Sequence, residues 1–111
     1  MMEIIEKKNN DIAIFEPVGR LDSNTSPELE KKIVKAIENG STKMIIDFKS
    51  LDYISSAGLR VINKTIKQLK NNSGNLVLCS MQDYIKEVFE ITGFDSFLPI
   101  VSTYDEAVAK F

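Results

Sequence analysis

The chain has 111 residues and an apolar share of 43%, which suits one domain with an ordinary core spanning residues 1–111. Its net charge is −2, its lysines and arginines are spread along the chain, and no apolar run approaches the roughly 20 residues of a membrane span, so we expect neither direct nucleic-acid binding nor membrane insertion. With no histidine and one cysteine, the chain cannot form Ser-His-Asp triads, phosphohistidine relays, His-containing metal sites or thiolate metal clusters.

Two strands joined by a hairpin are predicted at the start of the chain. Residues 4–5 and 12–18 are the strands, and the polar residues 8–11 form the turn. The second strand has apolar residues at both alternating sets of positions, which indicates an inner strand with both faces buried. Pro17 weakens the end of this strand, because proline cannot donate a ladder hydrogen bond.

A loop and a first helix follow. The composition of residues 19–25 is typical of a loop. Ser26 is then predicted to cap a helix, with Pro27 at its first position and Gly40 after its end. The apolar stripe of this helix consists of Leu29, Ile33, Ala36 and Ile37.

The rest of the chain alternates between strands and helices. Residues 43–48 form a buried strand that ends in a polar turn, and residues 76–79 form the next strand. Between them an amphipathic helix begins at Leu59 and is stopped by residues 71–74. After them we expect a third helix at 82–91, a short edge strand within 97–101 and a last helix at 104–111.

The predicted order is therefore β-β-α-β-α-β-α-β-α. Strands separated by helices of this length favour right-handed crossovers and a mainly parallel sheet, to which the opening hairpin adds an antiparallel strand. We expect an α/β fold with a mixed, mostly parallel sheet and about four helices.

The most informative segment is Ser55-Ser56-Ala57-Gly58-Leu59, where a polar turn leads into a helix. In the simplest interpretation a serine caps the helix and Gly58 allows a close approach. In the functional interpretation one serine is a phosphorylation site. The free N–H groups and the dipole of a helix N-terminus would stabilise the attached phosphate. The sequence offers no base near this hydroxyl, so we expect the serine to be acted upon.

The segment L-D-Y-I-S-S-A-G-L-R-V, after I-I-D-F, resembles the signature of the STAS domain of bacterial anti-sigma factor antagonists. The upstream Gly19-Arg20-Leu21-Asp22 is similar to the Gly-x-Leu-Asp element of that family, and the predicted order of elements agrees over essentially the whole chain. The resemblance implies a single STAS-like domain. It places the phosphoacceptor at Ser56, with Ser55 as the second candidate, and an aspartate that engages the partner kinase at Asp22. Ser55 lies where many phosphorylated members have an acidic residue, and Ala57 lies where they have Ser or Thr.

The resemblance also implies a function. The unmodified protein would bind an anti-sigma factor that is also a serine kinase, phosphorylation would stop that binding, and a phosphatase would restore it. ATP would belong to the partner, so we expect no cofactor. From the missing histidine and the single cysteine we also expect no metal, no catalytic residue and a cytoplasmic location. The partner-binding residues are predicted to be Asp22, Ser55, Ser56, Ala57, Gly58, Leu59 and Arg60.

Two alternatives remain open. The domain could be a STAS scaffold in a signalling or transporter assembly that binds its partners without being phosphorylated. It could also be a small nucleotide-binding protein that uses the helix terminus at Ser56 as a phosphate site. Titration with ATP and GTP separates the second alternative from the others.

Overall fold

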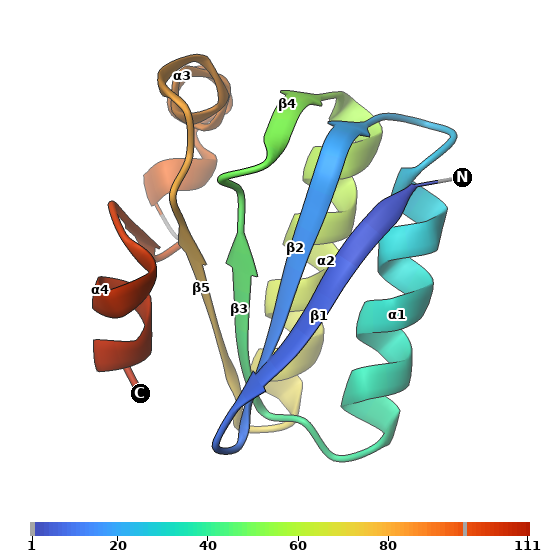
Figure 1. The fold of residues 1–111 in the computed structure, drawn as a ribbon, viewed down its shortest axis with the longest axis vertical. Helices are drawn as coiled ribbons and strands as arrows, with labels where there is room; N and C mark the ends of the chain where they lie inside the picture. The colour runs from blue at the N-terminus through green and yellow to red at the C-terminus, as the bar shows by residue number, and fades with distance from the viewer. Residues whose placement is uncertain (1, 97) are drawn as a thin grey trace.

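The computed structural model describes residues 2–96 and 98–111, and these form a six-stranded mixed sheet with helices on both faces (Figure 1). Its main strand order is β1-β2-β3-β5-β6, and β4 pairs with β2. The β1–β2 pair is antiparallel and all other pairs are parallel. This arrangement confirms the predicted fold. The strands are β1 (Glu3–Asn9), β2 (Ile12–Leu21), β3 (Lys43–Asp47), β4 (Leu51–Ile54), β5 (Asn75–Cys79) and β6 (Ile100–Val101).

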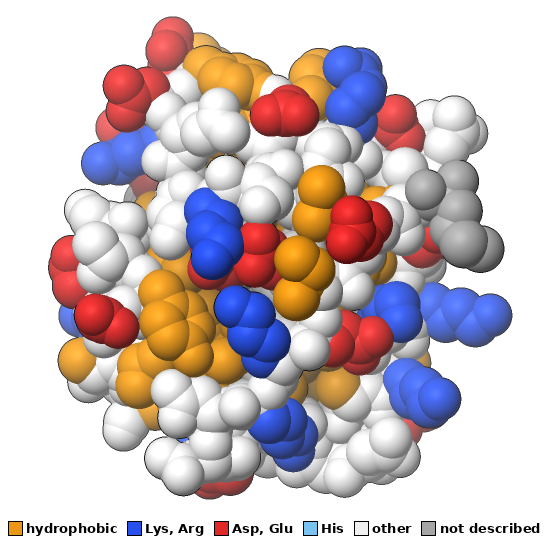
Figure 2. Space-filling model, viewed as in Figure 1, with side chains coloured by type: hydrophobic (Ala, Val, Ile, Leu, Met, Phe, Trp, Pro, Cys, Tyr) orange, Lys and Arg blue, Asp and Glu red, His pale blue; other side chains and the backbone are white. Residues whose placement is uncertain are grey.

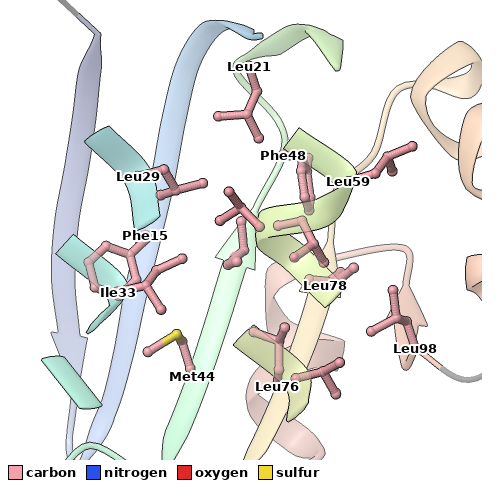
Figure 3. Packing of buried hydrophobic residues seen from close by; sticks show 14 of the residues in the cluster. Phe15, Leu21, Leu29, Ile33, Met44, Phe48, Leu59, Leu76, Leu78 and Leu98 are labelled. Atoms are coloured by element: carbon pink, nitrogen blue, oxygen red, sulfur yellow. The ribbon is translucent and has the colours of Figure 1, made fainter. Parts of the chain in front are cut away.

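The helices divide unequally between the two faces of the sheet. The helices are α1 (Ser26–Glu38), α2 (Ser56–Asn71), α3 (Asp83–Thr92) and α4 (Tyr104–Ala109), and a 3₁₀ turn, η1 (Phe94–Ser96), follows α3. In the view of Figure 1, α1 and α2 lie behind the sheet. They cover the larger hydrophobic cluster, part of which is drawn in Figure 3. The short helix α4 covers a smaller cluster on the opposite face.

Strand β2 contributes to both clusters, as its apolar pattern predicts. Ala13 and Phe15 pack into the larger cluster, whereas Ile12 and Ile14 pack into the smaller one. The strand is therefore buried on both faces, with β1 and β3 as neighbours.

Strand β4 is the main difference from the predicted elements. The polar turn expected before the serines is instead a strand over Leu51–Ile54, and β2 extends to Leu21, into the expected loop, to pair with it. The segment lacks the alternation of a typical strand, because Leu51 and Ile54 are buried whereas Asp52 and Tyr53 are exposed. The parallel register shifts between Gly19 and Arg20, so a β-bulge separates the two parts of β2.

Two helix starts also differ from the prediction. Thr25, and not Ser26, is the N-cap of α1, and Ser26 is a buried first residue of the helix. Helix α2 begins at Ser56, three residues before Leu59. The apolar pattern did not indicate this start, because the first turn of the helix carries small and polar residues. The predicted strand within 97–101 is limited to Ile100–Val101, and residue 97 lies outside the described part of the chain.

Candidate functional site

The ends of β2 and β4 bring the two sequence motifs side by side. Leu21 and Ile54 are partners in the parallel register, and the N–H of Ser55 donates a 2.9 Å hydrogen bond to the carbonyl oxygen of Leu21. Asp22 and Ser55 therefore follow neighbouring strand ends. The Asp22 loop and the serine turn lie side by side at the carboxyl ends of two parallel strands, where ligands commonly bind.

The two serines occupy different positions at the start of α2. Ser55 is the N-cap, with extended backbone, and its Oγ accepts a 3.5 Å hydrogen bond from the N–H of Gly58. Ser56 is the first helical residue and is exposed. Within residues 2–96 and 98–111 its hydroxyl makes no hydrogen bond. Capping thus engages Ser55 and leaves the Ser56 hydroxyl available to another molecule.

Gly58 fixes the position of this helix start. A Cβ atom at residue 58 would lie 2.8 Å from Cγ1 of Ile54 and 3.0 Å from the side chain of Leu21, distances that side chains do not normally reach. The first turn of α2 therefore packs directly against the ends of β4 and β2, and only glycine fits there. This observation confirms the simplest interpretation of Gly58 as a close-approach residue.

The Asp22 side chain stabilises its own loop through hydrogen bonds to the backbone. Its Oδ1 accepts hydrogen bonds from the N–H groups of Asn24, at 2.9 Å, and Thr25, at 3.1 Å. The Thr25 hydroxyl accepts from the N–H of Asp22 at 2.9 Å and donates to the carbonyl oxygen of Arg20 at 2.7 Å. The Asn24 and Thr25 hydrogen bonds lower the pKa of the Asp22 carboxyl below its usual value. Sequence reasoning assigned Asp22 to a partner and did not predict this structural role.

Arg20 and Tyr53 form a second feature that the sequence did not reveal. They are register partners on β2 and β4, and the Arg20 guanidinium lies 4.2 Å from the centre of the Tyr53 ring. The Nε of Arg20 is also 3.9 Å from Oδ2 of Asp22. Both side chains are exposed, so a cation–π pair lies beside the serine turn. The sequence could predict this contact only if β4 were recognised as a strand that pairs with β2.

The remaining predicted site residues differ in what they can offer a partner. Arg60 is exposed, one helical turn after Ser56, and Ala57 is half-buried. Gly58 and Leu59 are buried, and Leu59 packs in the larger hydrophobic cluster. The buried pair positions the helix start, whereas Ala57 and Arg60 can be contacted from outside.

Two buried carboxylates lie on β2 and β3, away from the serines in sequence. Oε2 of Glu16 accepts a 2.7 Å hydrogen bond from the Ser50 hydroxyl, and Lys7 and Lys49 each place Nζ 3.8 Å from its Oε1. Asp47 accepts a 3.0 Å hydrogen bond from the N–H of Lys49. These contacts hold the short turn between β3 and β4, so we assign both carboxylates a structural role.

Metal and thiol chemistry receive no support from the geometry. In the part of the chain that the structure describes, no three Cys, Asp or Glu side chains are grouped so that they could hold a metal ion. The Cys79 thiol is buried, and desolvation raises its pKa to about 11. No helix among the described residues is both long and apolar enough to cross a bilayer.

Comparison with known proteins adds independent information. The family model for the STAS domain matches residues 3–107. BtrV of Bordetella bronchiseptica, a provisionally named anti-sigma factor antagonist, is 40% identical over 93 residues, which is 84% of this chain and 80% of that protein. The anti-sigma-B factor antagonist of Staphylococcus aureus is 30% identical over 82 residues, which is 74% of this chain and 76% of that protein.

The fold comparison agrees with the sequence comparison. The crystal structure of a provisionally assigned anti-sigma factor antagonist from Thermotoga maritima superposes with a TM-score of 0.92 at 22% identity. The match covers 96% of this chain and 92% of that one. At this level of identity the likeness establishes the shared fold.

Proposed function

This chain belongs to the STAS domain family of anti-sigma factor antagonists, and we propose that it binds an anti-sigma factor that is also a serine kinase. Binding would release a sigma factor from inhibition. Phosphorylation of Ser56 by the same kinase would end the binding, and a phosphatase would restore it. In this proposal the kinase supplies the ATP site and this chain supplies the acceptor hydroxyl.

The observation that carries the proposal is the contrast between the two serines. Ser55 uses its side chain to cap α2, whereas the exposed Ser56 hydroxyl makes no hydrogen bond to the described residues. A kinase must reach a hydroxyl that is free of internal bonds and accessible from outside. Of the two serines, Ser56 meets both conditions.

The position of Ser56 also suits a phosphate. It is the first residue of α2, where N–H groups lack intrahelical acceptors and the dipole favours negative charge. The first turn contains no acidic residue that would repel the phosphate, and Arg60 lies one turn further along the helix. The folded domain should therefore accept the modification at little cost.

A partner surface shaped for a neutral hydroxyl would not accept it so easily. A phosphate adds about −1.5 to −2 charge at pH 7 and must be desolvated on entering an interface. A penalty of about 3 kcal/mol would weaken the complex roughly a hundredfold. The switch therefore needs no change of fold.

The experiment is incubation of the purified protein with its cognate kinase and ATP, followed by site-resolved mass spectrometry. Ser56→Ala should abolish phosphate incorporation, and Ser55→Ala serves as the matched control that should retain it. If the wild-type chain binds the kinase but incorporates no phosphate at either serine, the non-phosphorylated scaffold becomes the better explanation.

A further inference from the structure

Helix α3 carries an apolar stripe beside its buried face, and the middle residue of this stripe, Val88, packs against the larger hydrophobic cluster. Tyr84 and Ile91 on this helix are 43% and 77% exposed, and Val88 between them is half-buried. The spacing of four and then three residues places the three side chains along one side of the helix. Tyr84 and Ile91 are two of the three large hydrophobic residues that are exposed in the described chain, the third being Tyr53.

The exposed residues of the stripe, Tyr84 and Ile91, are not needed to attach α3 to the domain. Ile85 and Phe89 are fully buried, and the Phe89 ring packs edge-on against Phe48 with 6.0 Å between ring centres. At the start of the helix, the side-chain amide of Gln82 donates a 3.1 Å hydrogen bond to the carbonyl oxygen of Leu51. The inner face of α3 therefore has its own contacts, and the two exposed residues are additional to them.

A row of carboxylates borders the stripe. Asp83, Glu87 and Glu90 follow Tyr84 and Ile91 around the helix on the side away from the buried face, and all three are exposed. Across residues 2–96 and 98–111, none of the three forms an ion pair, whereas Glu6, Asp11, Glu16, Asp22 and Glu30 each pair with a lysine or arginine. The row therefore has no ion-pair partner among the described residues, and Lys86 is the one basic residue on the same helix.

The acidic row belongs to a wider separation of charge. Residues 81–111 contain six acidic and two basic residues, a net charge of −4, while residues 1–80 contain ten acidic and twelve basic residues, a net charge of +2. Figure 2 shows acidic side chains along the side that holds α3 and α4, with a basic side chain among them, whereas most of the visible basic side chains lie across the centre and the other side, interspersed with acidic ones. A basic partner segment would thus be attracted to the α3 side.

We propose that the outer face of α3, defined by Tyr84, Val88 and Ile91 with Asp83, Glu87 and Glu90 along its edge, docks a basic amphipathic helix of a partner protein. The stripe offers apolar anchors spaced as a partner helix would present its own, and the carboxylates select lysine or arginine beside them. This surface does not include Ser56, so the inference stands apart from the proposed switch.

Other occupants fit the charge pattern less well. A second copy of this chain would bring a second acidic row against the first, which costs free energy. An anionic bilayer would be repelled by the same carboxylates, because such surfaces attract basic segments. A basic protein helix satisfies both the apolar stripe and the acidic row.

The test uses the full chain and two synthetic amphipathic helical peptides of roughly 18 residues, or five helical turns. Both peptides carry the same leucine stripe, flanked by lysine in one and by glutamate in the other. With the lysine peptide, the amide chemical shifts of the isotope-labelled chain should change at residues 83–92, and the change should saturate as peptide is added. With the glutamate peptide, these shifts should stay unchanged. Asp105 and Glu106 on α4 are an internal control, because charge alone would attract the peptide there as well.

Substitutions complete the test. Ile91→Ser should weaken the lysine peptide about tenfold without lowering thermal stability, because Ile91 lies outside the core. Val34→Ser on α1 is the matched control and should leave the affinity unchanged. Glu87→Lys should weaken the lysine peptide and allow the glutamate peptide to bind, whereas Glu38→Lys on α1 should do neither.

Four results would overturn the proposal. They are equal binding of both peptides, shifts spread evenly over α3 and α4, an affinity unaffected by Ile91→Ser, and a dimer of the chain alone in sedimentation that Ile91→Ser dissociates. The last result would assign the stripe to a second copy.

Discussion

The backbone N–H of Ser55 and the carbonyl oxygen of Leu21 are joined by a 2.9 Å hydrogen bond. This bond ends the parallel pairing of β2 with β4 and places two loops next to each other. One loop contains Asp22 and the other leads into the exposed Ser56.

Ser55 and Ser56 should respond differently to removal of the hydroxyl. Ser55→Ala removes the N-cap acceptor of α2 and should lower the free energy of unfolding by roughly 0.5–1 kcal/mol, the lower part of the usual range because the cap distance is 3.5 Å. Ser56→Ala removes an exposed hydroxyl and should change stability by less than about 0.5 kcal/mol. Urea denaturation measures both values. A larger loss for Ser56→Ala than for Ser55→Ala would show that the capping assignment is wrong.

Gly58→Ala should destabilise the domain although alanine is the better helix former. The added methyl group would lie 2.8 Å from Cγ1 of Ile54, so the start of α2 or the end of β4 must move. Overpacking of this kind costs about 1–3 kcal/mol, which outweighs a propensity gain of up to about 1 kcal/mol. Lys67→Ala, at an exposed position of the same helix, is the control and should leave stability nearly unchanged. Equal stability of Gly58→Ala and wild type would argue against the close packing.

Asp22 can be tested for two roles with two substitutions. Asp22→Asn keeps an oxygen that accepts from the N–H groups of Asn24 and Thr25 but removes the charge, whereas Asp22→Ala removes both. We expect Asp22→Asn to retain the loop and Asp22→Ala to lower the melting temperature. If both variants lose partner binding at pH 7, the charge itself is required. Full binding by Asp22→Asn would leave Asp22 with the structural role alone.

The pH dependence of stability supplies a further readout for the same carboxyl. Its pKa in the folded state lies below the ordinary value of 3.8, so the folded state holds the proton less tightly than the unfolded chain. The stabilisation is therefore complete above that ordinary value and is lost as the pH falls through the lower, folded-state pKa. Asp22→Asn should show a smaller loss of stability over this acid range than wild type.

Cys79 should be unreactive while the domain is folded. Its side chain is fully buried on β5, and burial raises its pKa to about 11, so little thiolate exists at neutral pH. A thiol reagent added at pH 8 should therefore react only as fast as the domain opens, and the rate should rise in urea. Rapid stoichiometric modification of the native protein would contradict the burial of this residue.

The sequence could predict the elements whose apolar pattern is regular. Strand β2 has apolar residues at both alternating sets of positions and is buried on both faces as expected, and the amphipathic pattern that begins at Leu59 lies in helix α2. Strand β4 was missed because only its first and last residues, Leu51 and Ile54, are buried, while Asp52 and Tyr53 between them are exposed. Local pattern cannot show that such a segment pairs with the end of β2, because that pairing depends on the bulge after Gly19.

The same limit explains what was missed at the site. The position of Ser56 at a helix start could be inferred from small and polar residues before an apolar stripe. The contact of Arg20 with Tyr53 could not, because it requires β4 as a strand. The structural role of Asp22 could not be predicted either. In the sequence, an aspartate three residues before Thr25 is equally consistent with a contact inside the loop and with a contact to a partner.

Phosphorylation of Ser56 should act locally and leave the fold unchanged. The Ser56 side chain is exposed, so a phosphate displaces no core residue, and it would face the free N–H groups at the start of α2. Favourable interaction with the helix dipole should raise the free energy of unfolding by roughly 0.3–1 kcal/mol. The circular dichroism spectra of the two forms should coincide, and amide shifts should change only near residues 20–25 and 53–62. A lower melting temperature of the phosphorylated form, or shifts throughout the sheet, would mean that the switch acts by unfolding. Equal partner affinity of the two forms would exclude the switch altogether.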